Sequence, residues 1–99
     1  GGENVYSTEV ENALYEHPSV LEAAVFGRPD ATFGEGVNAA VVLRPGSRLG
    51  AGELADFCRA RIAGYKIPRA IEFLAELPKT GSGKISKHAL RSRRPRADG

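Results

Sequence analysis

The fold is decided by the stretch Val20–Phe26, which reads Val-Leu-Glu-Ala-Ala-Val-Phe, and by a second apolar run at Val37–Leu43. Both runs are short and rich in valine or alanine, and turn-forming residues bound them, as is typical of β-strands. Glycine, proline and aspartate punctuate the segments Gly27–Asp30 and Gly34–Gly36, so we expect the connection between the strands there. Arg44–Ser47, Arg-Pro-Gly-Ser, predicts a turn that closes the second run.

A helix is predicted before the first strand. Thr8 followed by Glu11 indicates a capping box, in which each side chain satisfies an orphan backbone N–H. Apolar residues then recur at helical spacing, and the run ends at His17 and Pro18. The spaced residues are Val10, Ala13 and Leu14.

A second helix is predicted between the second and third apolar runs. Leu54, Phe57, Cys58 and Ile62 form one apolar stripe, and Gly64 predicts its C-terminal stop. Cys58 is the only cysteine, which excludes an internal disulfide and fits a reducing compartment. We expect Cys58 to be a buried core residue rather than a reactive thiol.

Two shorter elements complete the pattern. A third strand is expected at Ala70–Leu74, after Pro68 ends the preceding helical segment. A short helix is expected around Ser86–Arg91, and a short strand or hairpin at Asn4–Tyr6. The order of elements predicts an α+β fold in which a small three-stranded sheet, with this N-terminal addition, packs against about three helices.

Length and composition limit the functions open to this chain. Its 99 residues, 41% hydrophobic and 26% charged, make one globular domain with little room for a deep substrate pocket. We therefore expect any catalytic work to be shared with another domain. No stretch approaches the roughly 20 apolar residues of a membrane span. The start, Gly1–Asn4, resembles the middle of a loop, so we expect a fragment of a longer protein.

Charge is distributed unevenly along the chain. Residues 1–78 carry seven basic and eleven acidic residues, a net charge of −4, whereas residues 79–99 carry seven basic residues and Asp98, a net charge of +6. Such a basic end could bind nucleic acid, an anionic membrane or a phosphorylated small molecule. No aromatic residue interrupts these charges, which disfavours single-stranded nucleic acid.

The stretch Leu77–Ile85, Leu-Pro-Lys-Thr-Gly-Ser-Gly-Lys-Ile, carries the clearest chemical signal. Its glycines would let backbone N–H groups approach an anion, and lysine supplies a compact positive charge. It is not a P-loop, because Pro78 stands where a glycine is required and Ile85 follows Lys84 in place of serine or threonine. Spacing alone leaves open an anion-binding loop and a plain exposed turn.

The same stretch closely resembles the last signature of the adenylate-forming superfamily, which includes acyl- and aryl-CoA ligases, luciferases and the adenylation domains of peptide synthetases. Gly2–Val5 and Glu9–Glu11 look like an earlier signature at the start of the superfamily's C-terminal domain. Other segments follow the pattern in order: His17–Val20, Glu22–Val25, Gly27–Asp30, Gly34–Glu35 and Gly64–Arg69. The resemblance covers residues 1–91, and residues 92–99 are expected to form a basic, disordered tail.

Within the superfamily, Tyr65–Arg69 and Pro78–Lys84 resemble acid–CoA ligases more than peptide synthetases. Such a ligase joins a carboxylic acid to CoA through an acyl-adenylate, with ATP and CoA as substrates. Its C-terminal domain rotates between the two half-reactions against an N-terminal adenylate-binding domain, which would also hold Mg²⁺. The alternatives are an adenylation domain of another branch, such as a peptide synthetase or acyl-AMP ligase, or a free-standing module that binds anions or nucleic acid.

The resemblance also implies roles for single residues. Lys84 matches the lysine that enters the active site for adenylation, and Thr80, Gly81, Ser82 and Gly83 form its loop. Gly1, Gly2 and Glu3 match a loop that faces the CoA channel, and Arg59 lies where some relatives place an arginine near the CoA phosphates. No metal ligands are expected in this chain, because it has no Cys/His cluster of the right spacing. We expect a cytoplasmic enzyme that is inactive as the isolated chain and binds no nucleic acid.

Overall fold

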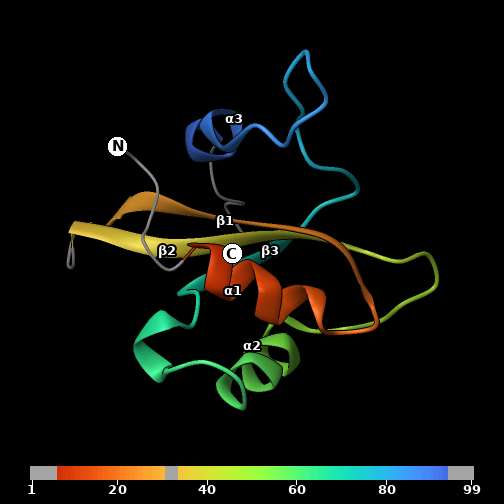
Figure 1. Cartoon of the computed structure of the whole chain (residues 1–99), viewed down its shortest axis with the longest axis vertical. Helices are drawn as coiled ribbons and strands as arrows, with labels where there is room; N and C mark the ends of the chain where they lie inside the picture. Colours follow the sequence, from red (N-terminus) through yellow and green to blue (C-terminus); the bar gives the residue numbers. More distant parts are fainter. Residues whose placement is uncertain (1–6, 31–33, 94–99) are drawn as a thin grey trace.

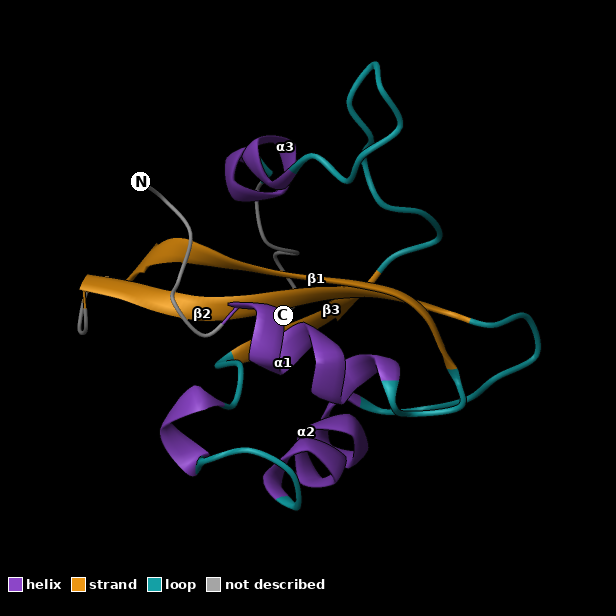
Figure 2. Cartoon of the chain, viewed as in Figure 1, coloured by secondary structure: helices purple, strands orange, loops and turns teal. Residues whose placement is uncertain are grey.

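A long antiparallel hairpin forms the centre of the computed structural model, which describes residues 7–30 and 34–93. Helices α1 and α2 cover one face of its sheet, and α3 covers the other (Figure 1). Figure 2 shows these three layers by element type. The predicted α+β fold with a three-stranded sheet and three helices is confirmed. The elements are α1 (Ser7–Tyr15), β1 (Val20–Asp30), β2 (Gly34–Leu43), α2 (Ala51–Arg59), the 3₁₀ turn η1 (Gly64–Lys66), β3 (Ala70–Phe73) and α3 (Lys87–Ser92). The N-terminal strand predicted at residues 4–6 lies outside the described residues.

The hairpin is longer than predicted. β1 and β2 pair from Val20 opposite Leu43 to Asp30 opposite Gly34, so the expected connection at Gly27–Asp30 and Gly34–Gly36 is in fact strand. The prediction was wrong because interstrand pairing continues through these glycines and through Pro29. β1 is an edge strand, where a proline does not interrupt a ladder on its outer side.

β3 completes the sheet in the order β1-β2-β3 and runs parallel to β2. Two parallel neighbouring strands need a crossover connection. Between β2 and β3 this connection contains α2 and η1, and it lies on the face of the sheet that α1 also covers. The strand predicted at residues 70–74 is confirmed within one residue of its end. The predicted turn is confirmed as well, since Ser47 N donates to Arg44 O and Gly46 has a positive φ.

Two helix boundaries differ from the prediction. α1 begins at Ser7, so Thr8 lies inside the helix, and Glu11 accepts a hydrogen bond from Val25 N instead of serving in a capping box. α2 ends at Arg59, and Gly64 opens η1 rather than stopping α2. The short C-terminal helix is confirmed as α3, whose N-cap Ser86 accepts from Ala89 N.

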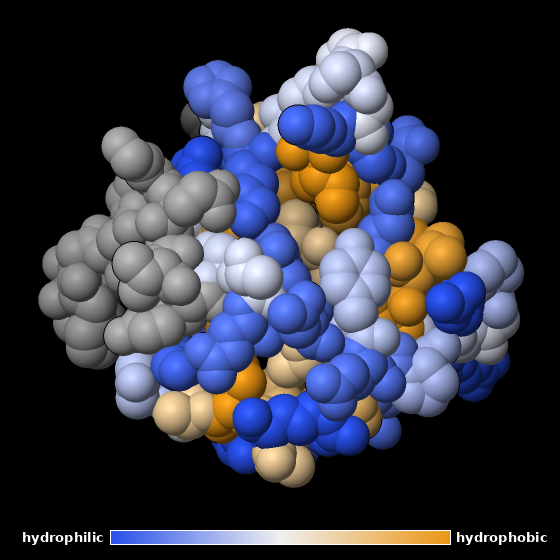
Figure 3. Space-filling model, in the orientation of Figure 1, coloured by the Kyte–Doolittle hydropathy of each residue, from blue (hydrophilic) through white to orange (hydrophobic). Residues whose placement is uncertain are grey.

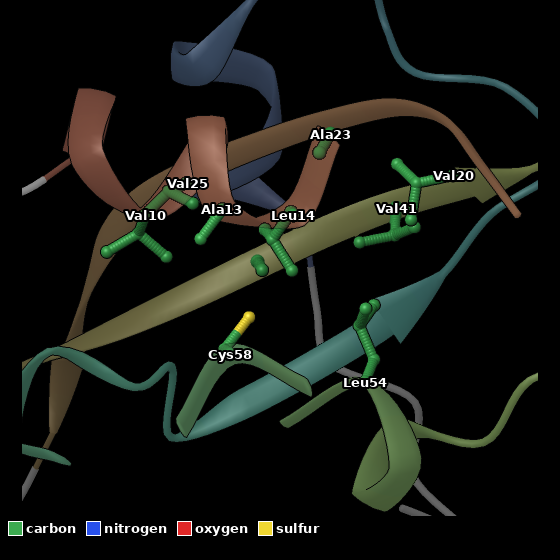
Figure 4. Close-up of a cluster of buried hydrophobic side chains, with 10 residues drawn as sticks. Val10, Ala13, Leu14, Val20, Ala23, Val25, Val41, Leu54 and Cys58 are labelled. Carbon is green, nitrogen blue, oxygen red and sulfur yellow. The ribbon is translucent and has the colours of Figure 1, made fainter. Parts of the chain in front are cut away.

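The sheet separates two hydrophobic cores. The α1/α2 core contains Val10, Ala13, Leu14, Val20, Ala23, Val25, Ala39, Val41, Leu54 and Cys58 (Figure 4). The α3 core contains Ala24, Phe26, Ala40, Val42, Leu77 and Leu90. Successive residues of a strand point to opposite faces, which explains why Ala24 and Val25 belong to different cores. Cys58 is fully buried, as predicted. Among the described residues, no helix has the length and apolar character needed to cross a membrane.

Candidate functional site

Lys84 lies on a short antiparallel ribbon, Pro78–Ser86, which we call the Lys84 ribbon. Thr80 N donates to Lys84 O at 2.7 Å, and Ser86 N donates to Pro78 O at 2.8 Å. Lys79 and Ile85 form the bridge between these two bonds. The ribbon extends from the α3 side of the sheet, at the upper right of Figure 1. Lys84 is therefore carried by hydrogen-bonded backbone.

The tip of the ribbon is a tight turn. Gly83 N donates to Thr80 O at 2.9 Å, and Gly83 has a φ of +90°, which favours glycine. The Thr80 hydroxyl lies 3.0 Å from Ser82 Oγ and accepts from Lys84 N at 3.3 Å. These two hydroxyls therefore order the turn, while Gly81, Ser82 and Gly83 stay exposed.

The pairing register decides where Lys84 points. Side chains that lie opposite each other in an antiparallel pair share one side of the ribbon, and their neighbours point to the other side. Ile85 packs against the α3 core, so Lys79 shares the sheet side and Lys84 faces away. Lys84 is exposed, and it has no ion-pair partner among the described residues. In Figure 3 the tip of the ribbon is pale, near the middle of the hydropathy scale, and it lies above a group of hydrophobic side chains.

Arg59 lies in a different layer. It is the last residue of α2, which covers the opposite face of the sheet from the Lys84 ribbon. Its exposed guanidinium pairs with Asp56 on the same helix. The structure therefore presents Lys84 and Arg59 on opposite sides and does not bring them together. Gly1, Gly2 and Glu3 lie outside the described residues.

Comparison with known proteins identifies this arrangement. Residues 9–84 match the family model described as the AMP-binding enzyme C-terminal domain, and Lys84 is the last residue of the match. The chain belongs to this family. This family model covers more than half of the chain, which confirms the resemblance of the sequence motifs to the C-terminal domain of the adenylate-forming superfamily.

Individual relatives agree with this family membership. The chain is 52% identical to a feruloyl-CoA synthase from Amycolatopsis over 93 residues, which cover 94% of this chain and 19% of that protein. It is 51% identical over 90 residues to a long-chain-fatty-acid–CoA ligase from Bacillus subtilis, covering 91% of this chain and 16% of that protein. ATP-bound MatB from Rhodopseudomonas palustris superposes with a TM-score of 0.84 at 37% identity, covering 92% of this chain and 18% of that structure. The chain thus spans less than a fifth of the length of these relatives.

This member of the AMP-binding enzyme C-terminal domain family offers a shallow cavity of about 340 Å³ beside the Lys84 ribbon. Its lining is mostly apolar, with Glu76 and Arg93 as the charged members; the lining residues are Leu74, Ala75, Glu76, Leu77, Pro78, Ala89 and Arg93. A cavity of this size is at the lower limit for a small-molecule site. Within the described residues, no group of three histidine, cysteine, aspartate or glutamate side chains could hold a metal ion.

One charged contact at the base of the ribbon was not predicted from the sequence. Lys79 Nζ lies 3.2 Å from Glu22 Oε2, so β1 and the ribbon are joined by an ion pair. The two residues are 57 positions apart in the sequence, and no local pattern indicates their contact. In the sequence, Glu22 and Lys79 belong to separate motifs.

Proposed function

We propose that this chain is the C-terminal domain of an acid–CoA ligase, which converts a carboxylic acid, ATP and CoA into acyl-CoA, AMP and pyrophosphate. The observation that carries the proposal is the position of Lys84. Its ammonium group is exposed on the outer side of an ordered ribbon, within a sequence that resembles the superfamily's adenylation signature. CoA ligases and a CoA synthase among the relatives support this reaction class.

In the first half-reaction, a carboxylate oxygen of the acid attacks the α-phosphorus of ATP, and pyrophosphate leaves. Lys84 would hold the acid carboxylate and the α-phosphate together, because both are anions that repel each other. Its fixed positive charge would also stabilise the charge that develops in the transition state. Lysine suits this role, since a point charge on a long stem can be moved into and out of a site.

In the second half-reaction, the CoA thiol attacks the acyl carbonyl, the thiol proton leaves, and AMP is released. We assign this step to a different face of the domain, because Arg59 lies on the opposite side of the sheet from Lys84. Arg59 would contact CoA phosphates, and Gly1, Gly2 and Glu3 would line the approach of its thiol arm. Rotation of the domain would exchange the two faces.

The partner in both steps would be an N-terminal domain of the same protein that binds ATP and the acid. We assign Mg²⁺ to that partner domain as well, since the ion would bind together with the ATP phosphates. Residues 1–91 would form the moving domain and residues 92–99 a basic tail, in a cytoplasmic enzyme. The acid is proposed only as a class, since similar relatives are named for feruloyl-CoA and for long-chain fatty acids.

The test is Lys84→Ala in the full-length protein, with each half-reaction assayed separately. Adenylation, followed by pyrophosphate exchange, is expected to fall by about 10²- to 10³-fold, the range for removal of one preorganised transition-state contact. Thioester formation from a supplied acyl-adenylate is expected to stay within about twofold, since Lys84 is withdrawn in that step. Arg48→Ala removes another exposed cation, in the connection between β2 and α2, and serves as the matched control. Equal loss of both steps would contradict the proposed division of labour.

A further inference from the structure

The orientation of Lys84 depends on what holds the sheet side of its ribbon. Two side chains face the sheet there, Ile85 and Lys79. Ile85 packs against the α3 core, and this packing holds its side of the ribbon against the core. Lys79 pairs with Glu22, and its ammonium lies 3.2 Å from carboxylate Oε2 and donates to Oε1 at 3.4 Å.

A β-bulge places Glu22 where it can reach the ribbon. The register shifts between Val20 and Glu22, with Leu21 as the extra residue on β1. Val20 and Ala23 are three residues apart and yet both lie in the α1/α2 core, which a regular strand would not allow. Bulges re-aim side chains in this way. Without the shift, Glu22 would share the face of Val20 and point away from Lys79.

The ion pair is connected to Lys84 through the ribbon backbone. Lys79 and Ile85 lie directly opposite each other, and Lys84 adjoins Ile85 on the other side of the ribbon. Thr80, the neighbour of Lys79, donates its N–H to Lys84 O. A rotation of the ribbon that separated Lys79 from Glu22 would therefore also turn the Lys84 side chain.

The geometry points to Glu22 as a positioning residue for adenylation, which holds Lys79 and thereby fixes the direction in which Lys84 leaves the ribbon. This inference rests on the proposed function of Lys84. It concerns the adenylation half-reaction alone, because Lys84 is withdrawn when the thioester forms.

The experiment uses Glu22→Gln in the full-length protein, with both half-reactions measured. Glu22 and Lys79 are part-exposed, 31% and 37%, so the pair is a modest restraint. We expect the adenylation rate to fall by about two- to fivefold and thioester formation from a supplied acyl-adenylate to be unchanged. The double variant Glu22→Lys with Lys79→Glu keeps the pair in reversed order and is expected to restore adenylation. Faster hydrogen exchange across residues 77–86 is expected in Glu22→Gln and not in the double variant.

The matched control is Glu16→Gln, which breaks an exposed ion pair of 2.8 Å with Arg61 on the α1/α2 side. It is expected to change neither half-reaction. Equal loss of both half-reactions in Glu22→Gln, no loss in either, or no recovery in the double variant would overturn the inference. Lys84→Ala is measured alongside. If Lys84→Ala lowers adenylation while Glu22→Gln leaves it unchanged, only the role of Glu22 fails; if Lys84→Ala leaves adenylation intact, the proposed function itself fails.

Discussion

Glu11 and Lys87 join the two helical layers around the edge of the sheet. Glu11 belongs to α1 and Lys87 to α3, and the carboxylate Oε2 lies 2.9 Å from the lysine Nζ. The same oxygen accepts a hydrogen bond from Val25 N of the edge strand β1 at 2.7 Å. One carboxylate therefore ties α1, β1 and α3 together, and only about a fifth of either side chain is exposed.

Glu11→Ala is expected to destabilise the 99-residue chain by about 2 kcal/mol, because it leaves the part-buried Val25 N–H without its acceptor. Glu11→Gln can still accept that bond and loses only the ion pair, so we expect a cost of about 1 kcal/mol or less. Urea unfolding measures both changes. Asn12→Ala, at an exposed position on the same helix, is the control and should shift stability by less than about 0.5 kcal/mol. Equal losses for Ala and Gln at position 11 would assign the whole effect to the charge.

The second prediction concerns the pKa of Cys58. Burial raises this pKa above its ordinary value, and the nearby Arg61 guanidinium opposes part of that rise. Because the folded state disfavours the thiolate, the stability that Cys58 contributes is fully present below the unfolded pKa of about 8.5 and is lost as pH rises through the folded pKa. We expect the free energy of unfolding to fall more steeply above pH ~8.5 in the natural chain than in Cys58→Ala. Parallel curves for the two proteins would contradict this, as would rapid labelling of the native thiol.

The third prediction concerns the tip of the Lys84 ribbon. Gly83 has a φ of +90°, and a Cβ placed there would meet no atom within 4 Å, so Gly83→Ala acts through backbone strain alone. Such strain costs about 1–2 kcal/mol, and we expect adenylation by the full-length protein to fall by roughly tenfold as the turn opens. Gly81→Ala is the matched control, since Gly81 is equally open and has no positive φ. Similar losses in both variants would show that chain flexibility, rather than the conformation at Gly83, matters.

The sequence predicted the elements of the fold better than their ends. The spacing of apolar residues located β3 and the buried stripe of α2, because side chains that point to the core recur at the period of the strand or helix. It misplaced the ends of β1 and α2, where Gly27 and Gly64 were interpreted as breakers although pairing and packing set the boundaries. The proposed role of Lys84 comes from its motif, whose residues are contiguous in the sequence. Glu22 was not assigned a role, because its contact with Lys79 depends on a bulge and spans 57 residues.

The last prediction separates the two faces of the domain. Arg59 ends α2 on the side of the sheet away from Lys84, so a role in CoA binding would leave adenylation untouched. We expect Arg59→Ala in the full-length protein to raise the KM for CoA by about tenfold, the loss of one charge-assisted hydrogen bond to a phosphate, while the adenylation rate stays constant. Asp56 pairs with Arg59. It would compete with a bound phosphate for that guanidinium, so Asp56→Asn should lower that KM or leave it unchanged. Steady-state kinetics with CoA and with dephospho-CoA measure the effect, since a contact to the 3′-phosphate would disappear with the second substrate. An unchanged KM in Arg59→Ala would remove Arg59 from the CoA site, and a parallel loss of adenylation would show that the two faces do not act separately.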